Sequence, residues 1–306
     1  MIIIKDIVIL LVSIIVIGKG AFWLVDAAAR VAKHFGISEL VIGLTVVAFG
    51  TSAPEFGVTI LAAIRGMGDI SVGNIVGSNI FNLGFILGGT AIIHSLKTSR
   101  TVVFRDGIFL LFGGILLSVF LWDLTLSKIE GIILFTLLVL YLLYLYFKKE
   151  TIETEEPTHA MYRWDPILLF VGIGLVIVGS HFLVESAVSI ARFMGVSDWV
   201  IGATIIAAGT SAPEFATSLT AAMKSRYGMS VGNLIGSDIF NLFGVLGVAG
   251  MMRNLSVGHD AHINLIILSF MIAVVLIFMR TGWVVSRKEG IILVMIGLLR
   301  WIYSFS

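Results

Sequence analysis

A seven-residue motif with the sequence GTSAPEF occurs twice in the chain, at residues 50–56 and again at residues 209–215. Each copy follows an apolar segment, so its carboxylate and two hydroxyl groups lie in sequence that is otherwise suited to lipid. A carboxylate inside a membrane costs at least about 2.5 kcal/mol, judged from aspartate, and is a functional candidate by default. The chemistry that the two copies offer is oxygen ligation, from Thr51, Ser52, Glu55, Thr210, Ser211 and Glu214.

A second repeated motif adds further oxygens: GNIVGSNIFN at residues 73–82 matches GNLIGSDIFN at residues 232–241. In each copy the serine lies four residues before the final asparagine, so the two side chains share one face of a helix. These residues are Ser78, Asn82, Ser237 and Asn241. Neither motif contains histidine, and the chain has no cysteine. Ca²⁺ takes 6–8 oxygen ligands in a flexible shell, whereas Mg²⁺ dehydrates reluctantly, so the set favours Ca²⁺ or Na⁺.

The proline of each GTSAPEF copy should interrupt a helix. Pro54 and Pro213 lack an N–H group and clash with the preceding turn, so each is expected to kink or break its helix. Such a break frees backbone carbonyl groups, which membranes tolerate only where they are buried in protein or line a watery cavity. We therefore expect backbone and side-chain oxygens to gather near the middle of the membrane.

Both motifs belong to one internal repeat. Glu214 follows Glu55 by 159 positions, and Asn241 follows Asn82 by the same interval. GISELVIGLTVVAFGTSAPEF also aligns without a gap with GVSDWVIGATIIAAGTSAPEF. Matching polar residues in a single register indicate a duplication. If a two-fold axis in the membrane plane relates the two halves, Glu55 and Glu214 face one site from opposite sides.

The composition is that of a membrane protein. The chain has 306 residues, of which 58% are hydrophobic and 13% charged, and its mean hydropathy is +1.07. Soluble domains contain about 25% charged residues. The net charge is +1, and no basic face with interleaved aromatic residues is visible, so we predict no nucleic-acid partner.

Ten apolar segments are long enough to cross a bilayer as helices, which predicts an all-α integral membrane protein. They cover residues 5–33, 37–64, 68–92, 101–121, 127–148, 166–192, 196–223, 227–251, 261–280 and 285–303. A hydrophilic linker, residues 148–165, separates a first half, residues 1–147, from a second half, residues 166–306. Because each half has five spans, the halves form inverted five-helix repeats, with helices broken at Pro54 and Pro213.

Lysine and arginine are unequally divided between the two sides of this topology. The side reached after the first span carries 13 of them, and the opposite side carries 6. Positive residues gather in cytoplasmic loops. We therefore predict a multi-pass protein of the plasma membrane with a cytoplasmic linker and extracellular N- and C-termini.

The paired motifs resemble the two alpha-repeats of the sodium/calcium exchanger family, part of the cation/Ca²⁺ antiporter superfamily, and suggest a prokaryotic member. The resemblance covers nearly the whole chain and implies an antiporter that exchanges Na⁺ for Ca²⁺ by alternating access, without a cofactor. Glu55 and Glu214 would be the central Ca²⁺ ligands, shared with Na⁺. The resemblance also implies hydroxyl or carbonyl ligands at the breaks from Thr51, Ser52, Thr210 and Ser211, flanking Na⁺ sites from Ala48, Ala207, Ser78 and Ser237, and a centre completed by Asn82 and Asn241.

Two positions need separate interpretation. K⁺-dependent relatives, and some prokaryotic members, carry aspartate where this chain has Asn241, so the resemblance argues against K⁺ co-transport. Asp238 is the counterpart of Asn79 in the first repeat. Its carboxylate would either face a neighbouring helix or reach the cavity as an extra carboxylate that binds a proton or a further Na⁺.

Several alternatives stay open at this point. An H⁺/Ca²⁺ antiporter of the same fold would protonate the glutamates instead of binding Na⁺, although such relatives usually carry asparagine at the position of Thr51. A cation channel would use rings of carbonyl or carboxylate groups, and a purely structural membrane protein would bind no cation. No nucleophile–base pair or cofactor motif is visible, so an enzyme is not predicted. The lipid bilayer is the expected partner, and no obligatory protein partner is evident.

Overall fold

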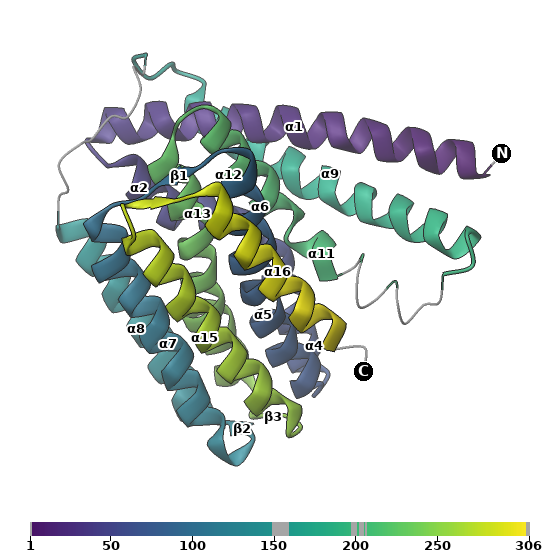
Figure 1. The fold of residues 1–306 in the computed structure, drawn as a ribbon, viewed down its shortest axis with the longest axis vertical. Helices are drawn as coiled ribbons and strands as arrows, with labels where there is room; N and C mark the ends of the chain where they lie inside the picture. Colours follow the sequence, from purple (N-terminus) through teal and green to yellow (C-terminus); the bar gives the residue numbers. More distant parts are fainter. Residues whose placement is uncertain (1, 149–158, 197–200, 202–204, 206, 304–306) are drawn as a thin grey trace.

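The structure is a computed structural model that describes residues 2–148, 159–196, 201, 205 and 207–303 (Figure 1). By length and composition, seven of the described helices could cross a membrane, or eight if the bent pair Glu39–Thr51 and Ala53–Ile64 is one span. The predicted span 285–303 corresponds to a helix of 17 residues. The predicted span 196–223 lies partly outside the described residues.

The helices and strands carry the labels of Figure 1, and η denotes a π-helical or 3-10 segment. Before the linker they are α1 (Ile2–Phe35), α2 (Glu39–Ile42), η1 (Gly43–Val47), α3 (Ala48–Thr51), α4 (Ala53–Ile64), α5 (Gly68–Phe81), η2 (Asn82–Leu87), α6 (Gly88–Ile93), β1 (Leu96–Lys97), η3 (Val102–Gly107), α7 (Ile108–Phe120), η4 (Leu121–Asp123), β2 (Thr125–Leu126) and α8 (Lys128–Phe147). After the linker they are α9 (Asp165–Phe193), α11 (Ala207–Thr210), α12 (Ala212–Met223), α13 (Tyr227–Ile239), η6 (Phe240–Val245), α14 (Leu246–Met252), β3 (Leu255–Ser256), α15 (Asp260–Arg280), β4 (Val284–Val285) and α16 (Arg287–Tyr303).

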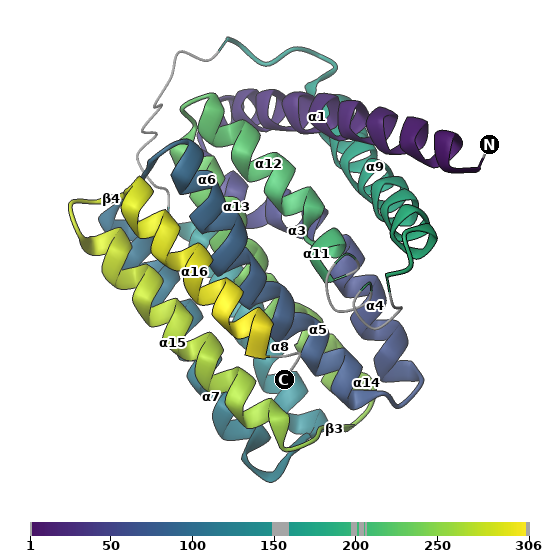
Figure 2. The ribbon, with the colours of Figure 1, turned by 45° about the vertical axis from the view of Figure 1, so that its right-hand side comes forward.

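Helices α1 and α9 pack side by side and are set at an angle to the other long helices (Figures 1 and 2). Small residues allow this close contact, because a Cβ atom at Gly172 would lie only 2.9 Å from the carbonyl oxygen of Gly20. In lipid, close backbone approach of this kind is a main source of helix association. Arg30 of α1 also donates two hydrogen bonds to Asp165 of α9, at 2.7 and 2.9 Å. The two helices are therefore tied to each other as a pair.

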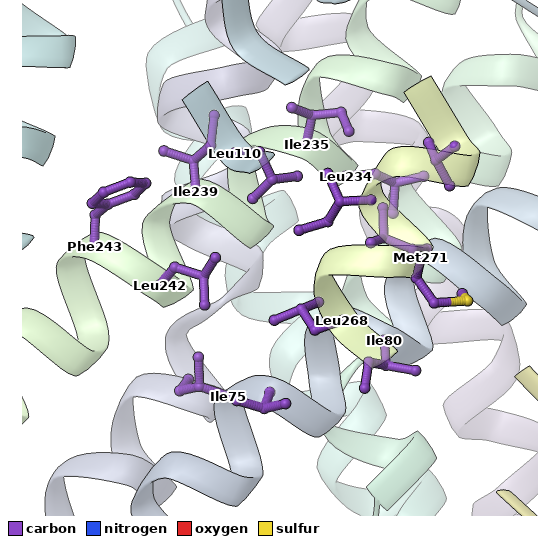
Figure 3. Close-up of a cluster of buried hydrophobic side chains, with 14 of the residues drawn as sticks. Ile75, Ile80, Leu110, Leu234, Ile235, Ile239, Leu242, Phe243, Leu268 and Met271 are labelled. Carbon is purple, nitrogen blue, oxygen red and sulfur yellow. The ribbon is translucent and has the colours of Figure 1, made fainter. Parts of the chain in front are cut away.

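The core of the remaining bundle lies around α5 and α13, which carry the second repeated motif. Both helices are largely buried by their neighbours, and α7 and α15 pack against them. Figure 3 shows the apolar side chains that meet there: Ile75, Ile80, Leu110, Leu234, Ile235, Ile239, Leu242, Phe243, Leu268 and Met271. This packing fixes the two helices that present the predicted ligands of the second motif.

The backbone repeats its turns at the interval seen in the sequence. Residues with positive φ occur as counterparts 159 positions apart: Gly36 and Gly195, Gly66 and Ser225, and Leu124 and Trp283. A residue in the left-handed region after a helix lets the last carbonyl groups find new donors. Helix starts recur as well, because Ser127 with Glu130 and Ser286 with Glu289 form the same reciprocal cap at α8 and α16.

Four two-residue strands, absent from the all-α prediction, join the two halves of the chain. Leu96 of β1 lies opposite Val285 of β4, and Leu126 of β2 lies opposite Leu255 of β3. Helix α15 separates the two pairs, because β3 precedes it and β4 follows it (Figure 1). We call these regions the β1–β4 end and the β2–β3 end. Strands this short leave no alternating pattern from which they could be predicted.

Candidate cation site at two helix breaks

The first GTSAPEF copy lies at a bend between two helices. Helix α3 ends at Thr51, α4 begins at Ala53, and the bend between the helical segments on either side of Ser52 is 52°. Pro54 stands in the first turn of α4, where its missing N–H group is tolerated because no helical acceptor is required. The interruption therefore falls at Ser52, two residues before the proline that causes it.

The second copy has the same local structure. Helix α11 ends at Thr210, α12 begins at Ala212, and Pro213 again lies in the first turn. In both copies the serine between the helices has φ and ψ outside the regular helical range, and its carbonyl oxygen accepts from the phenylalanine N–H four residues on. The glutamate of each motif consequently emerges from the first turn of the helix that follows the break.

The two breaks face each other, and each supplies a donor to the other's carboxylate. The Ser52 hydroxyl donates to Glu214 Oε1 at 3.0 Å, and the Ser211 hydroxyl donates to Glu55 Oε1 at 3.2 Å. Both glutamates are at most 1% exposed. The second oxygens, Glu55 Oε2 and Glu214 Oε2, have no hydrogen-bond donor among the described residues. Two buried carboxylates thus each keep one oxygen available to a ligand.

Two asparagines hold the turns from which the glutamates emerge. Asn74 Nδ2 donates to Thr59 Oγ1 at 3.0 Å and lies 3.4 Å from the backbone oxygen of Glu55. Its counterpart Asn233 makes the same bonds with Ser218 and Glu214, at 2.9 and 3.4 Å. The sequence prediction did not include Asn74 or Asn233. Their identical place in both copies of the second motif is the signal that could have identified them.

The predicted hydroxyl ligands are distributed around these carboxylates. Thr51 Oγ1 lies 3.2 Å from Asn233 Oδ1 and 3.5 Å from Ser237 Oγ, so it links the first break to α13. The Thr210 hydroxyl lies near the Glu55 carboxylate. Ser78 is buried beside a cavity of about 100 Å³, which Gly73 and Gly77 also line.

The predicted backbone ligands are described in part. The Ala48 oxygen accepts from the Ser52 N–H at 3.0 Å and lies 3.3 Å from Thr51 Oγ1, at the end of α3. Ala207 begins α11, and its side chain lies outside the described part of the chain.

A second polar layer lies next to the glutamates, where π-helical segments η2 and η6 contain the asparagines of the second motif. Asn82 Nδ2 donates to Asp238 Oδ1 at 2.9 Å, and Asn241 Nδ2 donates to Asn79 Oδ1 at 3.1 Å. Asn82 Oδ1, Asn241 Oδ1 and Asp238 Oδ2 have no donor in the described part of the chain. Asp238 therefore reaches the polar centre, and Asn79, which was not predicted as a site residue, lies there too.

The available atoms suit a hard cation. Among the residues that the structure describes, no three histidine, aspartate or glutamate side chains gather closely enough to form a metal site by themselves. A cation would therefore depend on amide, hydroxyl and backbone oxygens in addition to the two glutamates, as Ca²⁺ shells commonly do. Buried oxygens without a donor cost free energy unless a cation or water satisfies them.

Comparison with known proteins gives full-length matches. The family model described as sodium/calcium exchanger protein matches residues 5–147 and 164–301. The sodium/calcium exchanger MaX1 of Methanosarcina acetivorans is 32% identical over 94% of this chain and 95% of its own length. Inner membrane protein YrbG of Escherichia coli is 33% identical over 92% of this chain and 90% of its own.

A solved structure matches over the same extent. The sodium-calcium exchanger NCX_Mj, soaked with zero Na⁺ and Ca²⁺, superposes with a TM-score of 0.86 at 30% identity, covering 99% of this chain and 100% of that one. These matches confirm the family resemblance that the paired motifs indicated.

Proposed function

This chain belongs to the sodium/calcium exchanger protein family, and we propose that it exchanges Na⁺ for Ca²⁺ across a membrane by alternating access. The observation that carries this proposal is the crossed pair of carboxylates. Glu55 and Glu214 come from different repeats, each is held by a serine of the other repeat, and each keeps one buried oxygen without a described donor. A single divalent cation between them would balance both negative charges.

We further propose the predicted topology: ten spans in two inverted halves, residues 1–147 and 166–306, joined by linker 148–165, with helices broken at Pro54 and Pro213. The strands support the inversion. The repeat interval relates β1 to β3 and β2 to β4, and each counterpart lies at the opposite end of the bundle. A repeat that ran in the same direction would have its counterparts at the same end.

The excess of lysine and arginine supports an orientation. In the predicted topology, the side that includes the β1–β4 end carries 13 of these residues against 6 on the opposite side, which favours the cytoplasm for the β1–β4 end and for the linker. The N- and C-termini would then be extracellular, in a protein of the plasma membrane.

The ligands follow the pseudo-symmetry of the site. Glu55 and Glu214 would bind Ca²⁺ at the centre and share it with Na⁺, together with Asn82 and Asn241. The remaining oxygens would belong to the breaks and to flanking Na⁺ positions: Thr51, Ser52, Thr210, Ser211, Ala48, Ala207, Ser78 and Ser237. Asparagine at position 241 makes K⁺ co-transport an unexpected activity for this chain.

The two carboxylates also explain why exchange would be coupled. Moving an empty site through the membrane centre would carry two unpaired carboxylates through a region of low dielectric, which is unfavourable. Bound Ca²⁺ or Na⁺ removes that charge and permits the conformational change. Because both ions use overlapping oxygens, loading one requires release of the other.

The direct test is ⁴⁵Ca²⁺ uptake into proteoliposomes loaded with Na⁺ and diluted into Na⁺-free buffer. We expect uptake that requires the outward Na⁺ gradient and continues when pH is equal on both sides. Uptake that follows an outward H⁺ gradient and ignores Na⁺ would replace Na⁺ by H⁺ as the coupling ion. Large uncoupled currents would instead indicate a channel.

A further inference from the structure

We propose that Asp238 and Asn79 are positioning residues that turn the amide oxygens of Asn82 and Asn241 toward the transported cation. The proposal rests on the proposed function, because amide orientation matters to transport only if a cation binds beside it. Asp238 and Asn79 are counterparts in the repeat, and so are Asn82 and Asn241. Each positioning residue acts on the ligand residue of the other half.

The contacts form a closed set in the protein interior. Asn82 Nδ2 donates to Asp238 Oδ1 at 2.9 Å, and Asn241 Nδ2 donates to Asn79 Oδ1 at 3.1 Å. Asn79 Nδ2 in turn donates to the backbone oxygen of Asp238 at 3.1 Å. All four side chains are at most 1% exposed, so bulk water does not compete for these groups.

The order of donors and acceptors determines which way each amide faces. An amide presents oxygen on one side and NH₂ on the other, and its orientation follows from its hydrogen bonds. The Asp238 backbone oxygen can only accept, so Asn79 must direct its NH₂ there and its oxygen to Asn241. Asn241 then directs its NH₂ to Asn79, which leaves Asn241 Oδ1 unused.

The Asp238 side chain has the same effect on the other amide. Its carboxylate accepts from Asn82 Nδ2, so Asn82 Oδ1 must face away from Asp238. Neither Asn82 Oδ1 nor Asn241 Oδ1 has a donor among the residues that the structure describes. Amide oxygens are ordinary Ca²⁺ ligands, whereas a reversed amide would present NH₂ groups to the cation. Asp238 thus orients three amides through one carboxylate and one carbonyl group.

The competing interpretation is that Asp238 binds the cation itself through Oδ2. Substitution with asparagine separates the two roles, because an amide at position 238 can still accept from Asn82 but no longer offers a carboxylate. Asn79 occupies the counterpart position, so an amide fits this environment. Substitution with leucine removes both roles.

The experiment is Na⁺-dependent Ca²⁺ uptake by proteoliposomes at graded Ca²⁺ concentrations, for wild type, Asp238→Asn and Asp238→Leu. We expect the KM for Ca²⁺ to stay within about threefold of wild type in Asp238→Asn, and to rise roughly 10- to 100-fold in Asp238→Leu, the usual effect of leaving a buried polar group unpaired. The maximal rate should change less than KM. Asn79→Leu should raise KM through Asn241 in the same way.

Equal losses in Asp238→Asn and Asp238→Leu would overturn the positioning role and make the carboxylate a ligand. An unchanged KM in Asp238→Leu would also overturn it. Absence of Na⁺-dependent uptake in the wild type is a separate result, since it contradicts the proposed function rather than this inference.

A second set of variants keeps the test decisive if Asp238→Leu does not fold. Asn82→Asp replaces the donor at position 82 with an acceptor that faces the Asp238 carboxylate. This loss of the hydrogen bond should raise KM about tenfold or more. Combining Asn82→Asp with Asp238→Asn restores a hydrogen bond with the donor on the opposite side, so KM should return toward wild type. A double variant no better than Asn82→Asp alone would contradict the proposal, provided that size-exclusion chromatography shows both to be folded.

Discussion

The contacts made by the two repeats are similar at the centre of the molecule and different at its ends. At the centre the hydrogen bonds of the two glutamates and of the asparagines that hold them recur 159 positions away: Ser52 with Glu214 matches Ser211 with Glu55, and Asn74 with Thr59 matches Asn233 with Ser218. At the ends this correspondence fails. Lys224 Nζ lies 2.6 Å from Asp26 Oδ1 near the β1–β4 end, whereas the counterparts Arg65 and Glu185 form no ion pair with each other in the described chain.

Helix packing differs in the same way. Helix α1 packs against α12 on the Asp26 side, but the counterpart pair, α9 and α4, makes at most marginal contact. Glu185 instead lies 3.9 Å from His181, and both side chains are about two-thirds exposed. The structure is thus closed at the β1–β4 end and looser at the β2–β3 end.

The difference suggests that the centre binds the cation and that the ends control access to it. A cation site that serves both sides of a membrane should look the same from either side, so symmetry is expected at the centre. In the proposed exchange, access to the site alternates between the two sides of the membrane, so the ends should differ in any single state. In the opposite state we expect Arg65 to approach Glu185 while Lys224 separates from Asp26.

The largest effects should come from the central carboxylates. Replacing Glu55 or Glu214 with glutamine removes charge but little volume, and we expect Na⁺-dependent Ca²⁺ uptake to fall at least about 100-fold, or about 2.7 kcal/mol. The control is Glu185→Gln, an exposed carboxylate in α9, which should retain most activity. Wild-type uptake in either central variant would disprove the ligand assignment.

Smaller effects should follow from the asparagines that hold the helix breaks. Asn74→Ala and Asn233→Ala each leave a buried partner hydroxyl unpaired, at a cost of about 1–3 kcal/mol. We expect the Ca²⁺ KM to rise about tenfold in both variants, with lower melting temperatures. Because the two positions are counterparts, effects of very different size would argue against a symmetric centre.

The smallest effects should come from the ion pair at the closed end. The Lys224 and Asp26 side chains are 21% and 26% exposed, and such pairs contribute about 0.2–1 kcal/mol. Lys224→Met should therefore shift the balance between the two states by up to about fivefold. Exchanging the charges in Asp26→Lys with Lys224→Asp should restore the wild-type balance.

The shift in the balance between the two states can be measured by labelling a single introduced cysteine, because the chain has no cysteine of its own. A cysteine can be introduced at Gly73, which borders the cavity beside Ser78, because a Cβ atom there would have no described neighbour within 4 Å outside its own helix backbone. Labelling by an impermeant thiol reagent from outside should slow in Lys224→Met. Arg65→Met removes a contact expected only in the opposite state, so it should not slow labelling and should, if anything, speed it. Equal slowing in both variants would contradict the asymmetry of the ends.

Much of the site could be predicted from the sequence because its residues repeat. Glu55 and Glu214 share a register, and an inverted pair must converge near its axis. The crossed serine bonds were not predicted, because spacing alone does not state which repeat a hydroxyl faces. The π-helical segments at Asn82 and Asn241 were missed for a physical reason: one extra residue in a turn leaves no clear mark on a helical pattern.

Asn79 is another residue whose role could not be predicted from the sequence. Its sequence neighbours place it in a buried helix, and an asparagine there is equally compatible with a packing role. Only the hydrogen bonds to Asn241 and Asp238 assign it to the polar centre. Similarly, the strands that join the halves are too short to predict, although their positions also recur at the repeat interval.

The measurement that tests the central claim most directly is equilibrium Ca²⁺ binding to the purified protein, by calorimetric titration at increasing Na⁺ concentrations. Overlapping oxygens around Glu55 and Glu214 predict that the apparent Ca²⁺ affinity falls steadily as Na⁺ rises, and that Glu214→Gln abolishes binding. Ca²⁺ binding that is independent of Na⁺, or that survives in Glu214→Gln, would contradict a shared site between the two repeats.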